Sequence, residues 1–82
     1  MTYSVYILEC ADSTYYIGST KDIQKRLCAH NEGKSGAKYT RGRRPVVLRY
    51  REDGLTRGEA LKREAVLKKL SRFEKQKLFK KD

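Results

Sequence analysis

One carboxylate in the C-terminal half of the sequence, Glu64, stands among apolar residues at helical spacing. Ala60 and Leu61 precede it by four and three residues, and Leu67 follows it by three, so these side chains share one face of a helix. A carboxylate beside a core costs free energy unless a hydrogen bond, a cation or a metal ion compensates its charge. Two interpretations stay open: a residue of a functional site, or an ion pair with Lys68 worth about 0.3–0.5 kcal/mol.

A second pair of chemically capable residues, Arg26 and His30, is also spaced by four and borders Ile23 and Leu27. A permanently charged guanidinium and an imidazole that titrates near neutral pH therefore project together from one helix. The alternative is that both side chains are solvated at the helix edge, because a lone histidine is more often structural than catalytic. The pattern by itself does not decide between these interpretations.

Positive charge is concentrated in the middle of the chain. Residues 34–51 hold seven Lys and Arg and no acid, whereas residues 1–33 hold three bases and four acids, and residues 52–82 ten and six. Cations alternate there with aromatic and hydrogen-bonding groups on a Gly-flanked loop, which suits contact with a phosphate backbone. We expect nucleic acid to contact Lys38, Tyr39, Arg41, Arg43 and Arg44; the alternative is a solvated basic loop, and a membrane surface is less favoured.

The length and composition restrict the class of protein. The chain has 82 residues and a net charge of +10, which predicts one small domain over residues 1–82. No apolar run approaches the roughly 18 residues of a spanning helix, and no signal-peptide pattern follows the N-terminus, so we expect a cytoplasmic protein without membrane contact. The two cysteines, Cys10 and Cys28, form no Cys-x-x-Cys motif, and we expect both to be buried apolar groups.

Three segments favour strands. Residues 3–9 are β-branched and aromatic with little alternation, as in a central strand that is buried on both faces, and residues 14–17 follow as a hairpin partner. Residues 46–50 follow Pro45 and predict a third strand, with a turn at Asp53-Gly54. Between the second and third strands, helical spacing from Ile23 to His30 predicts a helix that ends near Glu32.

Two capping boxes predict two C-terminal helices. Thr56 with Glu59 should start a helix over about residues 57–70, and Ser71 with Glu74 a terminal helix over about 72–80. We expect Phe73, and with it Leu78 and Phe79, to cover the core. The order β-β-α-β-α-α excludes a simple parallel βαβ array and predicts an α/β (α+β) domain whose three-stranded sheet, mixed or antiparallel, is flanked by helices.

Several short motifs occur in a defined order along residues 3–70: Ser4-Val5-Tyr6, Tyr16-Ile17-Gly18, Arg26, His30 and a late helix around Glu64. As an ordered set they resemble the GIY-YIG nuclease superfamily. The chain looks most like its small, single-domain, poorly characterised bacterial members, in which a stretch such as Ala37 to Arg41 follows a His-Asn pair such as His30-Asn31.

The resemblance implies a three-stranded antiparallel sheet and hydrolysis of DNA phosphodiester bonds with one divalent ion, Mg²⁺ or Mn²⁺. It implies Glu64 as the metal ligand and Arg26 as the group that stabilises charge on the scissile phosphate. Tyr16 is similar to the tyrosine proposed to activate water, with Tyr6 beside it and His30 assisting. A phenol has a pKa of about 10, so we expect the metal, Arg26 or His30 to lower it.

The sequence also departs from the family pattern. Ser4 replaces a glycine in the first motif, Ser19 stands where similar repair nucleases carry lysine, and Asn31 is the only asparagine, so one following the glutamate helix is missing. Three functions therefore stay open. The first is a metal-dependent endonuclease, structure-specific in DNA repair or processing, with DNA favoured over RNA; the second is a non-catalytic nucleic-acid-binding module; the third is a basic module that recruits a repair partner.

Overall fold

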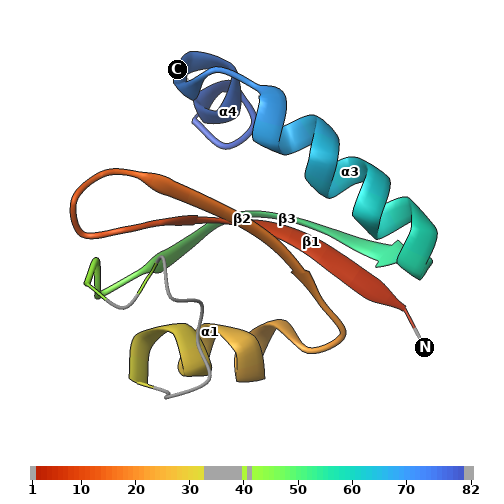
Figure 1. The fold of residues 1–82 in the computed structure, drawn as a ribbon, viewed down its shortest axis with the longest axis horizontal. Helices are drawn as coiled ribbons and strands as arrows, with labels where there is room; N and C mark the ends of the chain where they lie inside the picture. Colours follow the sequence, from red (N-terminus) through yellow and green to blue (C-terminus); the bar gives the residue numbers. More distant parts are fainter. Residues whose placement is uncertain (1, 33–39, 41, 81–82) are drawn as a thin grey trace.

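The computed structural model describes residues 2–32, 40 and 42–80, which form a three-stranded sheet with helices on both of its faces (Figure 1). The described elements follow the expected order β-β-α-β-α-α. They are β1 (Tyr3–Glu9), β2 (Tyr15–Thr20), α1 (Ile23–Glu32), β3 (Val47–Leu55), α3 (Arg57–Lys69) and α4 (Arg72–Lys77).

The sheet is antiparallel throughout, with strand order β2-β1-β3. The first strand is thus central, as its nearly continuous apolar run predicts, and its residues from Val5 to Leu8 are buried. In the β1–β2 hairpin Tyr6 lies opposite Gly18 and Val5 opposite Ser19. β2 and β3 are therefore the edge strands of the sheet, and each pairs with β1 along one side.

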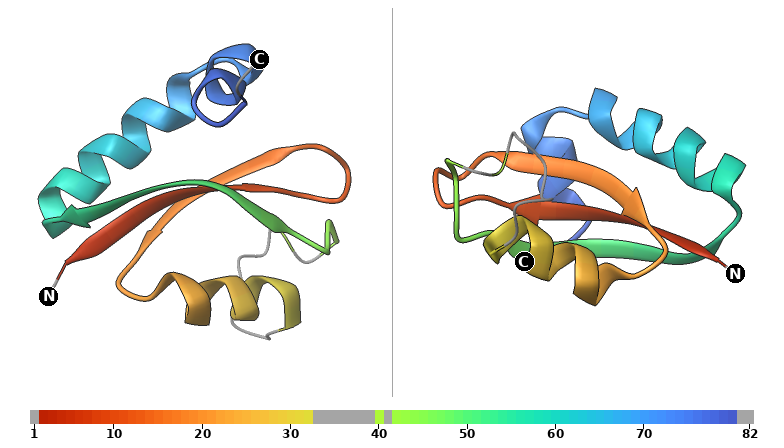
Figure 2. Two further views of the ribbon diagram at one scale, coloured as in Figure 1. Left: turned by 180° about the vertical axis from the view of Figure 1, so that it is seen from behind. Right: turned by 60° about the horizontal axis from the view of Figure 1, so that its bottom comes forward.

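Helix α1 covers one face of the twisted sheet, and α3 and α4 cover the other (Figures 1 and 2). Since successive side chains of a strand point to opposite faces, β1 supplies both cores. Val5 and Ile7 pack with Ile17 and with residues of α3, whereas Tyr6 and Leu8 pack with Ile23 of α1. The domain therefore has three layers, and the sheet in the middle contributes side chains to the core on each of its faces.

Both predicted capping boxes are present. The Thr56 hydroxyl accepts from the Glu59 amide at 3.1 Å, and the Glu59 carboxylate accepts from the Thr56 amide at 2.8 Å. Ser71 and Glu74 repeat this arrangement at the start of α4. Because each box satisfies two backbone donors that a helix start leaves free, the break between α3 and α4 is encoded locally.

Two strand boundaries differ from the sequence prediction. β2 continues through Thr20 because Gly18 and Ser19, expected to end it, pair with β1. β3 continues through Leu55, and Asp53-Gly54, expected as a turn, form a β-bulge opposite β1 where the register shifts. Gly54 has a φ of +75°, which glycine adopts without steric cost, so the strand passes through the bulge instead of reversing.

Three predictions of burial were wrong, and α4 ends at Lys77 rather than near residue 80. Cys28 is exposed although Cys10 is buried, and Leu61 and Phe73 are 54% and 64% exposed. Leu78 and Phe79 do pack against the core beneath α3, as expected. Phe73 fails because it lies in the first turn of α4, a helix that ends at Lys77 and is too short to bury two faces. Within the described residues, no helix has the length and apolar character needed to span a membrane.

Candidate active site

The tyrosine of the first motif, Tyr6 in β1, lies opposite a glycine of β2, Gly18. Tyr6 is only 3% exposed. A Cβ atom added to Gly18, its partner across the hairpin, would stand 2.6 Å from the Tyr6 hydroxyl oxygen and 3.1 Å from the Tyr16 ring. The first distance is shorter than a non-bonded contact allows and the second is tight, so the missing side chain of Gly18 gives the Tyr6 hydroxyl its place on this face.

The Tyr6 hydroxyl begins a chain of buried polar groups. It lies 3.1 Å from His30 Nε2, and His30 Nδ1 lies 3.0 Å from the hydroxyl of Thr40; His30 and Thr40 are both completely buried. Arg26 also hydrogen-bonds the Tyr6 side chain. Since a guanidinium can only donate, we assign the Tyr6 proton to the bond with Nε2 and the imidazole proton to Nδ1, which donates to Thr40.

The electrostatics of this chain keep both rings neutral at pH 7. Burial raises the pKa of Tyr6 to about 12, against the opposing effect of its hydrogen bond with Arg26. Burial, followed by the nearby charges of Arg26 and Arg44, lowers the pKa of His30 to about 4. At Tyr6, desolvation of a phenolate therefore outweighs the attraction of Arg26, which by itself lowers the pKa.

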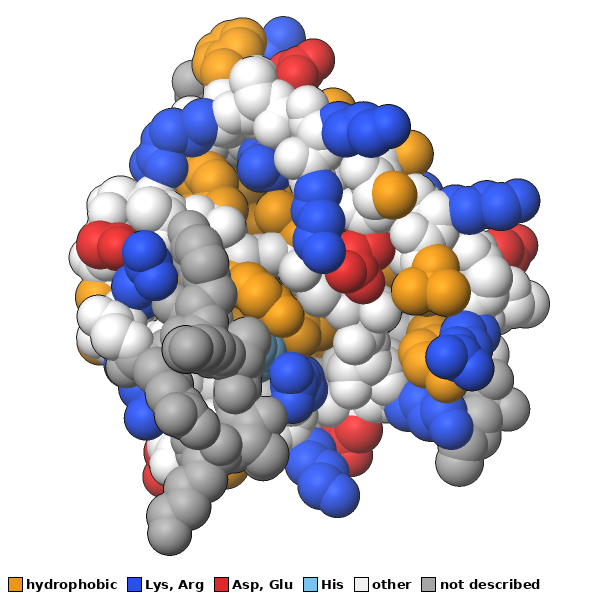
Figure 3. Space-filling view, in the orientation of Figure 1, with side chains coloured by type: hydrophobic (Ala, Val, Ile, Leu, Met, Phe, Trp, Pro, Cys, Tyr) orange, Lys and Arg blue, Asp and Glu red, His pale blue; other side chains and the backbone are white. Residues whose placement is uncertain are grey.

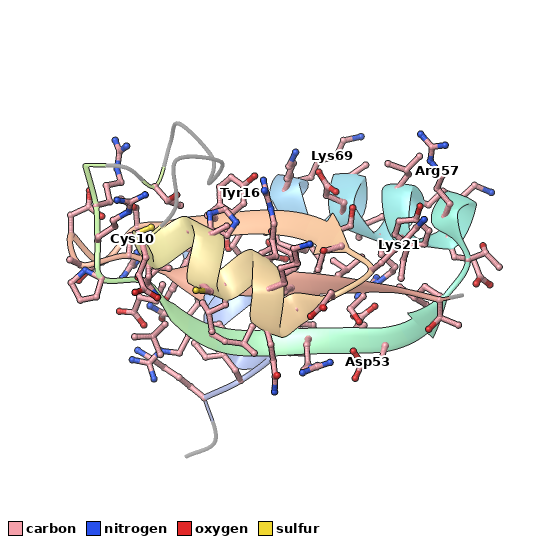
Figure 4. All side chains as sticks on the ribbon, turned by 90° about the horizontal axis from the view of Figure 1, so that it is seen from below. Cys10, Tyr16, Lys21, Asp53, Arg57 and Lys69 are labelled. Carbon is pink, nitrogen blue, oxygen red and sulfur yellow. The ribbon has the colours of Figure 1, made fainter. Side chains whose placement is uncertain are left out.

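The second tyrosine of the motifs packs onto this chain. The Tyr16 ring centroid lies 5.0 Å from that of His30 and 6.4 Å from that of Tyr6, and the rings are tilted by 60° and 41°. Tyr16 is half-buried, whereas Tyr6 is not accessible. The three rings thus form one cluster in which Tyr16 is the phenol nearer to solvent; Figure 4 labels it on β2 beside α1.

Glu64 reaches the same strand from the other layer of helices. Its Oε1 accepts a hydrogen bond of 2.9 Å from the Ser19 hydroxyl, and its Oε2 lies 2.8 Å from the Lys68 ammonium. The side chain is 21% exposed, between buried Ala60 and Leu67. Its charge contributes to raising the pKa of Tyr6. The predicted i, i+4 ion pair is therefore present, and the same carboxylate is also held against β2, the strand that carries Tyr16.

Lys68 belongs to this neighbourhood as well. The Glu64 carboxylate, and to a smaller extent Tyr16, raise the pKa of the Lys68 ammonium, which is therefore charged at neutral pH. The carboxylate oxygen that Lys68 contacts is one that a metal ion would use. The Lys68 ammonium is thus a cation of the protein itself that lies beside the residue predicted to be the metal ligand.

The donor set fits a metal ion bound through one carboxylate. Among the described residues, no group of three or more His, Cys, Asp or Glu side chains is placed to hold a metal ion. Mg²⁺ does not require such a group, since it keeps several waters and is bound through one or two carboxylates and substrate phosphate. Glu64 provides one carboxylate with a lone pair left on each oxygen, so Glu64 would hold Mg²⁺ or Mn²⁺ in competition with Lys68.

The basic segment is less free than its composition suggests. Arg43 forms an ion pair of 2.9 Å with Asp12, and Arg44 Nε donates to the His30 carbonyl at 2.6 Å. Arg49 and Arg51 likewise pair with acids, in β1 and in the β3 bulge. Counting charges within residues 34–51 missed these partners because all four lie outside that range. Lys38, Tyr39 and Arg41 lie outside the described residues.

Comparison with known proteins places this arrangement in a family. A family model described as the GIY-YIG catalytic domain matches residues 2–78, nearly the whole chain. The chain belongs to the GIY-YIG family. The resemblance deduced from the ordered motifs and the antiparallel fold that it implied are both confirmed.

Curated relatives of this GIY-YIG domain carry the name UPF0213 protein. One from Halobacterium salinarum is 53% identical over 75 residues, covering 92% of this chain and 96% of its own length. One from Syntrophus aciditrophicus is 57% identical over 76 residues, covering 93% and 87%. These names give the family and specify no reaction.

Two solution NMR structures share the fold. The UPF0213 protein BH0048 from Bacillus halodurans is 44% identical, with a TM-score of 0.59, covering 95% of this chain and 82% of its own. The protein EF2693 from E. faecalis is 38% identical, with a TM-score of 0.63, covering 95% and 83%.

Three residues of this GIY-YIG domain have roles that the sequence analysis did not predict. Ser19 holds Glu64, and its face was predictable, since two-residue alternation places Ser19 with Ile17 toward α3. Thr40 binds His30 Nδ1, a partner that only the fold supplies. Asn31 joins α1 to the start of β3 through two hydrogen bonds with the Val46 backbone, of 2.7 and 3.1 Å.

Proposed function

We propose that this GIY-YIG protein is an endonuclease that hydrolyses DNA phosphodiester bonds with one divalent metal ion, by direct attack of water. A single observation carries the proposal: Tyr6, Tyr16, Arg26, His30 and Glu64, drawn from two strands and two helices, gather around β2 and influence one another electrostatically. A guanidinium, phenols and a carboxylate together supply charge stabilisation, proton acceptance and metal ligation, which phosphodiester hydrolysis requires.

Each side chain then has a distinct task. Arg26, held at the Tyr6 hydroxyl, stabilises the negative charge that develops on the phosphate. Tyr16, the more accessible phenol, orients the attacking water and, after losing its own proton to solvent, accepts the water proton as its phenolate. The water oxygen bonds to phosphorus while the bond from phosphorus to the leaving sugar oxygen breaks, and solvent protonates that oxygen. Tyr6 and neutral His30 form the rigid base of the site, because their hydrogen bond and the bond to Thr40 allow one arrangement of the rings.

Glu64 would hold the metal ion, and the bound ion would supply activation of water and neutralisation of phosphate charge. Ser19 fixes the Glu64 carboxylate against β2. Fixing a ligand by a neighbouring hydrogen bond is a general property of metal sites. Lys68 must shift from Oε2 for that oxygen to take part, or remain as a second contact to the substrate.

The proposal is tested by cleavage of a substrate panel. Purified protein is incubated with plasmid, single-stranded, branched and RNA substrates in the presence of Mg²⁺ or Mn²⁺. At least one DNA substrate should be cut, and Glu64→Gln should reduce the rate by about 100-fold or more, with the fold confirmed by circular dichroism. Preference for branched DNA would assign the activity to DNA repair or processing.

A matched control is Glu32→Gln, because Glu32 is an exposed glutamate at the end of α1, bonded to Cys28. It should cleave as the wild type does. Equal background nicking by wild type, Glu64→Gln and Glu32→Gln would remove the enzyme proposal, since contamination would then explain it.

A second candidate is a non-catalytic nucleic-acid-binding module, and the ion pair between Lys68 and Glu64 favours it. An ammonium on the carboxylate neutralises the charge that a metal ion would neutralise. This function predicts binding that weakens steeply with salt, is reduced when Arg41, Arg43 and Arg44 are changed to Ala, and is indifferent to Glu64→Gln and to chelator. Metal-dependent cleavage would exclude it.

A further inference from the structure

A cavity outside the tyrosine cluster lies where β2 passes into α1. It has a volume of about 300 Å³, and its walls come from the end of β2 and the first two turns of α1: Thr20, Lys21, Asp22, Lys25, Arg26 and Ala29. Three of these six side chains are cationic and one is acidic. The lining is therefore positively charged, in a part of the sequence whose overall balance is slightly negative.

The one acidic group is already used by the backbone. The Asp22 carboxylate accepts from the Lys25 amide at 3.1 Å, and the Asp22 amide donates to the Thr20 hydroxyl at 3.2 Å. These bonds hold Asp22 as the residue that starts α1. Its carboxylate therefore turns toward the helix backbone, and Lys21, Lys25 and Arg26 dominate the electrostatic potential of the cavity.

Arg26 connects the cavity to the site. Its side chain lines the cavity and also hydrogen-bonds the Tyr6 hydroxyl. We propose, on the basis of the function proposed above, that this cavity binds a backbone phosphate of the nucleic-acid strand adjacent to the phosphate that is cleaved. Lys21 and Lys25 are then positioning residues, and Arg26 stands between two consecutive phosphate positions.

The chemistry of the lining selects backbone over bases. None of the six lining residues is aromatic, so the cavity offers no surface on which a base could stack. Ammonium and guanidinium groups bind phosphate oxygens without reading sequence. The Lys21 Nζ lies 5.5 Å from the centroid of the Tyr3 ring, within cation–π range. Figure 4 labels Lys21 just beyond the end of β2, the strand that carries Tyr16.

The test is a binding measurement that does not depend on cleavage. The double variant Lys21→Ala/Lys25→Ala is compared with wild type by fluorescence anisotropy, in EDTA, with DNA and RNA oligonucleotides of the same sequence. The variant should bind about 10-fold or more weakly at 0.1 M salt, and its slope of log K against log salt should be smaller by about 1 to 2, as expected for two lost phosphate contacts.

A charge-matched control lies on the other side of the sheet. Lys77→Ala/Lys80→Ala also removes two positive charges, from the α4 segment that packs on the face opposite α1 (Figure 1). It should change affinity by less than 3-fold. A loss that is equal in both double variants would overturn the proposal, because it would reflect net charge alone.

NMR titration distinguishes binding of a nucleic-acid phosphate in the cavity from binding of inorganic phosphate, and it tests the cavity independently of cleavage. Titration with the DNA oligonucleotide should shift the amides of residues 20–29 in wild type and not in the Lys21/Lys25 variant. Shifts of these amides by inorganic phosphate but not by DNA or RNA would overturn the proposal. Binding with these shifts but without cleavage would support phosphate binding in the cavity and contradict the proposed endonuclease activity. Cleavage by the wild type, with binding unchanged in the double variant, would support the endonuclease activity and contradict phosphate binding in the cavity.

Discussion

The two faces of the sheet are built from one strand but from different chemistry. The face under α3 buries Val5, Ile7, Ile17, Ala60 and Leu67, all of them apolar. The face under α1 also buries hydrocarbon, yet it contains a hydrogen-bonded chain from Tyr6 through His30 to Thr40. The comparison indicates that the α3 face supplies folding free energy, while the α1 face uses part of its interior to hold polar groups in fixed positions.

Such a division has a physical reason. Burying an apolar side chain stabilises the fold by about 1.5–3 kcal/mol without any demand on geometry. A buried imidazole or phenol stabilises only when each polar atom has a partner, and then allows few alternative arrangements. Every buried side-chain nitrogen and oxygen of the described residues has a partner, so the polar chain is complete. The polar groups of the candidate site on this face are therefore held by directional bonds.

The largest effect is expected on the apolar face. Leu67→Ala should lower the free energy of unfolding by about 2–5 kcal/mol, because Leu67 is completely buried and nothing else fills its volume. Chemical denaturation monitored by circular dichroism measures the change. Leu61→Ala, at a 54% exposed position of the same helix, should change the free energy by less than about 0.5 kcal/mol. Similar losses in both variants would contradict the assignment of stability to this face.

Acid should act through the α1 face. His30 has an ordinary pKa of 6.5 when unfolded and about 4 when folded, lowered by burial and by Arg26 and Arg44. Between these two pKa values the unfolded chain binds more protons than the folded one. The contribution of His30 to the free energy of unfolding is therefore complete above pH 6.5, and it is lost as the pH falls toward 4, by about 3 kcal/mol at most. Denaturation midpoints at pH 7, 5.5 and 4.5 measure the loss.

A glutamine at position 30 is the control for acid sensitivity, because it keeps hydrogen-bonding capacity and cannot titrate. His30→Gln should be less stable than wild type at pH 7 and should have a flatter profile between pH 6.5 and 4.5. A profile that is unchanged by His30→Gln would show that carboxylates, and not this imidazole, determine acid stability.

One added methyl group should disrupt the close contact between the Tyr6 ring and Gly18 in the β1–β2 hairpin. Gly18→Ala should cost about 1–3 kcal/mol, because its Cβ would require Tyr6 to move. NMR signals of Tyr6, Tyr16 and His30 should shift with it. Gly58→Ala provides the contrast, since no atom lies within 4 Å of its added Cβ and alanine favours the helix. A Gly18→Ala protein with unshifted ring signals would contradict the packing described.

The smallest effect is expected at the ion pair beside Glu64. Lys68→Ala should change stability by less than about 0.5 kcal/mol, because the pair is an i, i+4 contact and the Lys68 side chain is 56% exposed. It should raise the affinity of Glu64 for Mn²⁺ by roughly 3-fold, since the ammonium no longer competes. Calorimetric titration with Mn²⁺ measures this, with Lys69→Ala as the control one residue away. Equal Mn²⁺ affinity in all three proteins would show that Lys68 does not obstruct the carboxylate.

Much of the fold was predictable because its signals are local. The continuous apolar run from Val5 to Leu8 indicated a central strand, and the capping boxes at Thr56 and Ser71 marked two helix starts. The wrong predictions came from residues whose state depends on distant partners. Gly18 and Ser19 continue a strand because β1 pairs with them, and Asp53-Gly54 form a bulge because the same strand lies opposite.

The candidate site divides in the same way. Helical spacing brought Arg26 and His30 to one face and set Glu64 among apolar neighbours, and the ordered motifs added Tyr6 and Tyr16. Spacing could not tell whether His30 would be solvated or buried, nor which charge would contact Glu64. The ion pair with Lys68 is present, and the second carboxylate oxygen of Glu64 accepts from Ser19, a partner that the spacing did not indicate.

The amino-acid sequence by itself determined the family, the order of elements and the candidate residues of the site, because motif spacing, periodicity and capping act over a few neighbouring positions. Only the tertiary structure decided that Tyr6 and His30 are desolvated and neutral, that Thr40 and Ser19 complete the site, and that Arg26 faces both the phenol and a cationic cavity. Burial and electrostatic interaction depend on groups far apart in the chain, so these properties exist only once the strands and helices have packed together.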